Sequence, residues 1–178
     1  DGNVVAFVSN ATNLDPRDAS SNQSIYVRNL FAGTTQLVSI TDNESESANN
    51  TSLSPVLSAD GTVIAFESTA TNLDLLAPFG YSNIYVRDLE QGTTRLASIK
   101  NNDSSFAFSH SLTPSLSADG SIVAFRSSVP DFDSEIVSTG GFENIYVHDL
   151  THYITRLVSV NHDVTASGNG NSSKPIIS

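Results

Sequence analysis

The sequence predicts an all-β protein made of three repeated four-stranded units, and three observations support this fold class. First, the segment Ser54–Ser68, SPVLSADGTVIAFES, recurs as Thr113–Ser127, TPSLSADGSIVAFRS. Second, the Asp-Gly pairs begin at residues 1, 60 and 119, a constant spacing of 59. Third, the apolar runs are short and are separated by Gly, Pro, Asn, Asp and Ser, a pattern that is typical of strands and turns.

Each repeat has four strand-like runs in the same order. In the first repeat these are Val4–Phe7, Ile25–Leu30, Thr35–Ile40 and Pro55–Ser58. The first run is apolar on both alternating faces, which is typical of a strand whose sheet is packed between two others. Four strands joined in sequence by turns are the pattern of a β-propeller blade. We therefore predict one propeller segment over residues 1–178, with repeats 1–59, 60–118 and 119–178.

Three kinds of position recur in the repeats and predict structural roles. In the Asp-Gly turns, Asp accepts hydrogen bonds from local amides and Gly supplies a positive φ. A Phe in the first run is expected to be buried between neighbouring blades. A basic side chain in the second run is expected either to form ion pairs between blades or to line a ligand-binding ring in the propeller channel. These positions are Asp1, Gly2, Asp60, Gly61, Asp119 and Gly120; Phe7, Phe66 and Phe125; and Arg28, Arg87 and His148.

An aspartate recurs early in the long loop that follows the first run, at Asp15, Asp74 and Asp133. We expect these side chains to accept hydrogen bonds from loop amides. The third repeat adds further carboxylates near this position, and calcium binds six to eight oxygen ligands, several of them carboxylate. A candidate calcium site is therefore formed by Asp131, Asp133, Glu135 and Glu143.

Charge and composition limit the classes of partner and site. The chain has 8 Lys and Arg against 19 Asp and Glu, a net charge of −11 at pH 7. Such a surface repels phosphate groups, which argues against nucleic acid as the partner, and no apolar run approaches the roughly 20 residues of a membrane helix. The absence of Cys excludes disulfides and thiolate metal sites. No nucleophile elbow, phosphate loop or HExxH motif is present, so neither catalysis nor a cofactor is predicted.

The repeated residues resemble the TolB-type β-propeller repeat. The resemblance is carried by SPVLSADGTVIAFES at 54–68, NIYVRDL at 83–89 and GTTRL at 92–96, and it extends over all three units. It implies half of a six-bladed propeller in a secreted or envelope protein, bacterial or archaeal, that serves as a binding platform or as an accessory domain of an enzyme. The acidic loop pattern of calcium-binding relatives is mostly lost at residues 18–24 and 74–80.

The chain ends predict how the segment is completed. The last residues match the innermost strand of a blade, whereas the first residues belong to the strand next to it. Because an unpaired sheet edge tends to associate, we expect strand exchange between chains, as in a two-fold dimer. The residues that would take part are Val4, Val5, Pro175, Ile176 and Ile177.

The leading hypothesis is a non-catalytic binding or assembly module that is extracellular or periplasmic. Its partner would be a second copy or the rest of a longer chain, and its ligand a protein or a glycan. Two alternatives remain open. One is an accessory propeller segment of a larger secreted hydrolase or peptidase, and the other is a subunit of a head-to-tail filament.

Overall fold

The computed structural model describes residues 2–101, 108–136, 138 and 141–178, and the regular structure in these residues is β-strand. The strands are β1 (Val4–Ser9), β2 (Ser24–Asn29), β3 (Thr34–Leu37), β4 (Ser52–Leu57), β5 (Val63–Ser68), β6 (Asn83–Asp88), β7 (Thr93–Leu96), β8 (Ser111–Leu116), β9 (Ile122–Ser127), β10 (Asn144–Asp149) and β11 (Ile154–Leu157). Within the described residues, we find no helix that could span a membrane.

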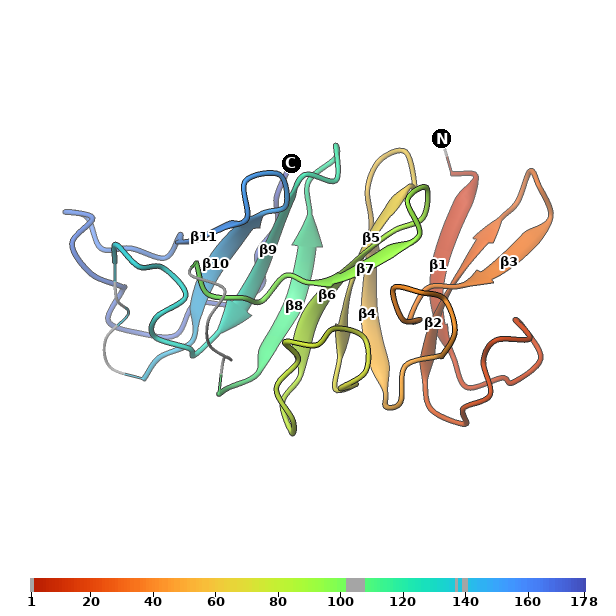
Figure 1. Cartoon of the computed structure of the whole chain (residues 1–178). Helices are drawn as coiled ribbons and strands as arrows, with labels where there is room; N and C mark the ends of the chain where they lie inside the picture. Colours follow the sequence, from red (N-terminus) through yellow and green to blue (C-terminus); the bar gives the residue numbers. More distant parts are fainter. Residues whose placement is uncertain (1, 102–107, 137, 139–140) are drawn as a thin grey trace.

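The strands form three antiparallel sheets that stand side by side in chain order (Figure 1). Sheet 1 has the order β1-β2-β3, sheet 2 the order β4-β5-β6-β7, and sheet 3 the order β8-β9-β10-β11. We name the contact between sheets 1 and 2 the first seam, and that between sheets 2 and 3 the second seam. The all-β, propeller-like architecture agrees with the sequence-based prediction.

The sheets differ from the predicted repeats in their boundaries. The complete sheets begin at Ser52 and Ser111, not at residues 60 and 119, because the innermost strand of each is the last segment of the preceding repeat. Sheet 1 consequently has three strands in the described chain, not four. Repeats of sequence and sheets of structure are therefore offset by one strand.

The innermost strands β4 and β8 also start earlier than the proline-containing runs suggest. Ser54 and Thr113 each have a φ of 54°, a left-handed conformation that is unfavourable for residues other than Gly. The strand register shifts at these positions in both sheets. Because Pro donates no backbone hydrogen bond, the strand continues past it only through this irregularity.

A Phe and a Tyr face each other on neighbouring strands of every sheet, with ring centroids 5.7 to 5.9 Å apart. The pairs are Phe7–Tyr26, Phe66–Tyr85 and Phe125–Tyr146. Each Tyr hydroxyl donates a hydrogen bond of 2.6 to 3.1 Å to a carbonyl of the long loop that follows β1, β5 or β9. The pairs thereby hold the long loops against the sheets.

Apolar side chains fill both seams. Phe66 belongs to a buried cluster with Ile25 of sheet 1, and Phe125 belongs to another with Ile84 of sheet 2. Both Phe side chains are fully buried, whereas Phe7 is half-buried. The prediction of burial is wrong for Phe7 because its face of sheet 1 points away from sheet 2, and no sheet of the described chain covers it.

Candidate functional site: the seams and the open faces

The second and third Asp-Gly turns each contact a valine of the preceding sheet. Asp60 accepts hydrogen bonds from the Thr62 amide at 3.0 Å and the Ser58 hydroxyl at 2.6 Å. Gly61 has a φ of 76°, and a Cβ added to it would lie 2.9 Å from Val4. Glycine is required there both by the turn and by the seam.

The equivalent turn of the second seam repeats this arrangement. Asp119 accepts hydrogen bonds from the Ser121 amide at 3.0 Å and the Ser117 hydroxyl at 2.6 Å. The Ser117 bond is the largest cause that lowers the pKa of Asp119 from 3.8 to about 2. A Cβ on Gly120 would lie 2.9 Å from Val63. Gly2 has the same positive φ, 74°, and Asp1 lies outside the described residues.

The recurring loop aspartates connect each long loop to the outermost strand of its own sheet. One carboxylate oxygen accepts a hydrogen bond of 2.9 Å from the backbone amide of a leucine in that strand. The other accepts one from the amide two residues further along the loop. The three pairs are Asp15–Leu37, Asp74–Leu96 and Asp133–Leu157.

An ion pair crosses the first seam at the predicted basic position. The side chain of Arg87 is fully buried and donates a hydrogen bond to Glu44, which lies in the loop after sheet 1. Glu44 also accepts from Arg17 at 2.9 Å, and Arg17 contacts Asp15 at 2.7 Å. The bond from Arg17 holds the pKa of Asp15 well below its ordinary range. Four charged groups are therefore joined across the seam.

The other members of the basic position have different partners. Arg28 donates to the Thr35 hydroxyl at 3.0 Å, and His148 shares a hydrogen bond of 2.9 Å with the Thr155 hydroxyl. Both contacts lie within one sheet. At this position, Arg87 forms the predicted ion pair between sheets, and its acidic partner is Glu44 of the loop after sheet 1.

The four carboxylates of the candidate calcium site do not converge. Asp131 pairs with Lys100 at 2.7 Å, Glu135 with Arg156 at 2.9 Å and Glu143 with Arg126 at 2.6 Å, while Asp133 accepts the loop and strand amides described above. Among the described residues, no group of three or more His, Asp and Glu side chains is arranged to hold a metal ion. The calcium site therefore stays a prediction.

Both seams share a pair of hydrogen bonds that the sequence did not reveal. The Thr94 hydroxyl of sheet 2 donates to the carbonyl of Ile40 at 2.7 Å, and the Thr155 hydroxyl of sheet 3 donates to the carbonyl of Ile99 at 2.7 Å. Asp42 and Asn101 accept from the backbone amides of the same threonines. Each outermost strand is thus bonded to the loop that follows the preceding sheet.

Sheet 1 has an open face and an open edge. Val5 is 45% exposed and Phe7 is half-buried, whereas Ile64 and Phe66, the same positions of β5, are fully buried. No described strand pairs with the inner edge of β1, whereas β4 and β8 pair with the equivalent edges of β5 and β9 in sheets 2 and 3. The sheet therefore lacks a neighbour in two directions.

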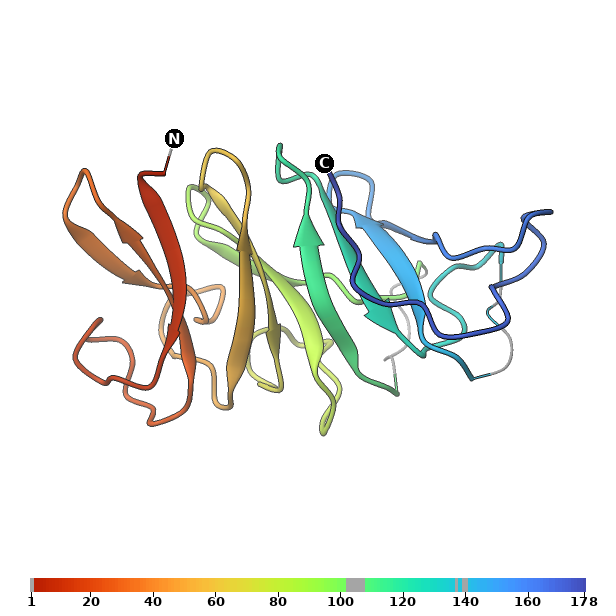
Figure 2. The same cartoon turned by 180° about the vertical axis from the view of Figure 1, so that it is seen from behind.

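Sheet 3 has an open face on its other side. Ile145 and Val147 are half-buried, whereas Ile84 and Val86, the same positions of β6, are buried. The segment after β11 lies on this side and reaches back toward the innermost strand (Figure 2).

The last segment, residues 174–178, runs along β8 (Figure 2), and the amide of Ile177 donates to the Ser115 hydroxyl at 3.1 Å. Lys174 has a φ of 58°, close to the 54° of Ser54 and Thr113. Lys174 and its following Pro stand at the same repeat position as these residues. The segment therefore has the backbone kink of an innermost strand, although no described strand pairs with it.

Comparisons with known proteins identify the fold. No protein-family model and no curated protein matches the chain. The structure is similar to TolB from Acinetobacter baumannii, with a TM-score of 0.51 and 18% identity over 88% of this chain and 29% of that one. It is also similar to the β-propeller domain of the Trilobed protease from Pyrococcus furiosus, with a TM-score of 0.50 and 17% identity over 87% of this chain and 38% of that one. The chain thus spans less than half the length of these structures, and it has a TolB-like β-propeller fold of which it contains three neighbouring sheets.

Proposed function

We propose that the chain is a non-catalytic binding and assembly module that completes its propeller with a second copy of itself. The observation that carries the proposal is the last segment, which has the kinked backbone of an innermost strand and lies beside β8 without a strand partner in the described chain. Sheet 1 offers the matching feature, a free edge at β1.

The physical driving force is the pairing of an open edge and the covering of two apolar faces. An unpaired strand edge presents free backbone donors and acceptors to another chain. In a two-fold dimer, the last segment of each copy pairs with β1 of the other, and sheet 3 of each copy packs on sheet 1 of the other. Both contacts occur twice, and a ring of about six sheets closes.

The resemblance to TolB-type propellers supports a periplasmic or extracellular location and a role as a binding platform. The closed ring would present its loops to a protein or glycan ligand. A second candidate function is favoured by the similarity to the propeller domain of a protease. In that case the missing sheets and a catalytic module would belong to the same polypeptide, and the chain would be an accessory segment of an enzyme.

Light scattering of residues 1–178 at micromolar concentration tests the proposal. We expect twice the monomer mass, and deletion of residues 174–178 should give a monomer or aggregates. A matched control is Leu75→Ser, which removes a fully exposed apolar side chain from a loop and should leave the dimer intact. A stable, folded monomer of the intact chain would contradict strand exchange and favour the accessory segment. Growth to ever larger particles would favour head-to-tail filaments.

A further inference from the structure

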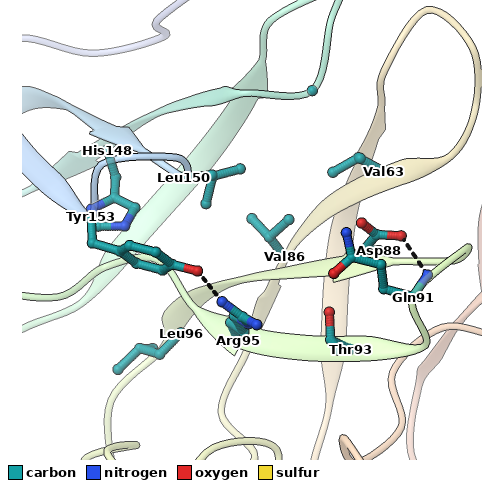
Figure 3. A pocket seen from close by; sticks show the side chains of 11 residues that line it. Val63, Val86, Asp88, Gln91, Thr93, Arg95, Leu96, His148, Leu150 and Tyr153 are labelled. Carbon is teal, nitrogen blue, oxygen red and sulfur yellow. Dashed lines mark hydrogen bonds between the residues drawn. The ribbon is translucent and has the colours of Figure 1, made fainter.

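A cavity of about 170 Å³ lies in the second seam, beside the hairpins β6–β7 and β10–β11 (Figure 3). Val63, Val86, Leu96 and Leu150 give it an apolar wall, and polar side chains surround them. The first seam has a cavity at the same repeat positions, with Val4, Val27 and Leu89 in its wall. The two cavities therefore lie at equivalent positions of the repeat. The lining residues that differ between them show which features belong to the second-seam cavity alone.

Arg95 is the first difference, because the first-seam cavity has Gln36 at this position. Arg95 is exposed and belongs to none of the ion pairs among the described residues, although acidic residues outnumber basic ones 19 to 8. Its guanidinium donates one hydrogen bond, to the Tyr153 hydroxyl (Figure 3). A guanidinium carries five N–H donors, so most of its capacity to bind an anion is unused.

Tyr153 is the second difference, and it stands where the other repeats have glycine. Gly33 and Gly92 occupy this hairpin position with φ of 67° and 68°, and Tyr153 has a φ of 56°. Left-handed backbone is unfavourable for a bulky side chain, and such residues concentrate at functional sites. The ring lies with its centre 5.7 Å from Cζ of Arg95 and edge-on to His148. Its hydroxyl accepts from Arg95 and still has its own hydrogen to donate.

We propose that this cavity binds a small carboxylate that carries a branched apolar group. Arg95 and the Tyr153 hydroxyl bind the carboxylate, and the valine and leucine side chains contact the apolar group. Asp88 lies across the cavity from Tyr153 and accepts bonds from its own turn amides, so its charge repels the ligand carboxylate toward Arg95 (Figure 3). A cavity of about 150 Å³ accommodates benzene, so a leucine-sized group fits in this volume.

A free short-chain acid and the C-terminal residue of a peptide share this chemistry. Titrations of the intact chain with N-acetyl-L-leucine and with the tripeptide Ala-Ala-Leu, followed by amide NMR shifts, distinguish the two sources. We expect saturable shifts at the second seam, with affinity at least about tenfold weaker for the corresponding amides, because the charge-assisted hydrogen bonds are lost. Tighter binding of the tripeptide would identify the C-terminal residue of a peptide as the ligand. Equal or tighter binding of N-acetyl-L-leucine would identify a free short-chain acid as the ligand.

Two variants replace Arg95 and Tyr153 by the residues at the equivalent positions of the first seam, Gln36 and Gly92. Arg95→Gln should weaken binding of N-acetyl-L-leucine at least about tenfold without loss of folding. Tyr153→Gly should weaken binding of N-acetyl-L-leucine. It should leave the melting temperature unchanged or raise it, since glycine adopts the left-handed conformation of this position without strain. Gln36→Ala in the first-seam cavity is the matched control and should leave affinity unchanged. The absence of saturable binding to the wild type, or binding that Arg95→Gln leaves intact, would overturn the proposal. The cavity lies within one chain, so this result is independent of dimerisation.

Discussion

The two seams join sheets of the same design, yet they differ at the hairpin side chains. Both have a fully buried Phe and a threonine that bonds to the preceding loop. In the first seam, Arg87 is paired with Glu44, and glycine occupies the hairpin. In the second, His148 and Tyr153 replace the arginine and the glycine. The two seams therefore share the buried Phe and the threonine bond, and they differ at the arginine and glycine positions beside them.

The largest effect is expected at the aromatic position, which tests what the seams share. Phe66→Ala and Phe125→Ala should each lower the free energy of unfolding by about 3–5 kcal/mol, because each removes a buried aromatic ring and leaves a cavity in the core. In the chain without residues 174–178, which is expected to lack the dimer contacts, Phe7→Ala should cost clearly less, since Phe7 is half-buried on the open face. Urea unfolding of the three variants measures the difference. Equal losses would mean that the face of sheet 1 is covered in solution.

An intermediate effect is expected from the ion pair found in the first seam. Glu44→Gln should lower the free energy of unfolding by about 1–3 kcal/mol, because it leaves the buried Arg87 guanidinium without its carboxylate. The double variant Arg87→Met with Glu44→Gln should recover part of that loss, since no buried charge remains. A double-mutant cycle from urea unfolding gives the coupling. Additive losses would show that the two side chains act independently.

The smallest effect concerns pH at the turn of the second seam. The folded pKa of Asp119, about 2, lies below its ordinary value of 3.8, so its contribution to stability is complete above about pH 4 and is lost as the pH falls toward 2. Asp119→Asn should therefore make unfolding less sensitive to acid in this window. Urea unfolding at pH 2, 3, 4 and 6 measures the slope, with the exposed Asp163→Asn as a control. An unchanged acid slope in Asp119→Asn would show that this turn does not contribute.

The sequence was sufficient for the blade pattern and for its turns, because these depend on local residue types. The Asp-Gly turns and the alternation of apolar runs act over a few residues and are repeated at a constant spacing. The offset between repeats and sheets is also implied by the repeat, since the strand before each Asp-Gly turn pairs with the strand after it. The sequence did not reveal the early start of β4, because a proline after Ser54 is typical of the beginning of a strand. The left-handed conformation of Ser54, which lets the strand extend back to Ser52, is not visible in the sequence.

The side-chain partners across the seams could not be predicted from the sequence. Glu44 and Arg87 are brought together only when sheet 2 packs on sheet 1, and nothing in their local sequence links them. The carboxylates from Asp131 to Glu143 are close in sequence, but each contacts an arginine or lysine from another segment, and Arg156 contacts both Asp133 and Glu135. Tyr153 could have been noticed, because alignment of the three hairpins places it opposite Gly33 and Gly92.

The threonine bonds of the two seams also bear on the order in which the protein forms. Thr94 and Thr155 bond to the carbonyls of Ile40 and Ile99, which precede them in the chain. During synthesis from the N-terminus, β7 and β11 therefore leave the ribosome after the loop whose carbonyl their threonine binds. Since each sheet contacts only its neighbours, folding is expected to proceed sheet by sheet toward the C-terminus. A ribosome stalled after sheet 2 should already carry a protease-resistant first seam.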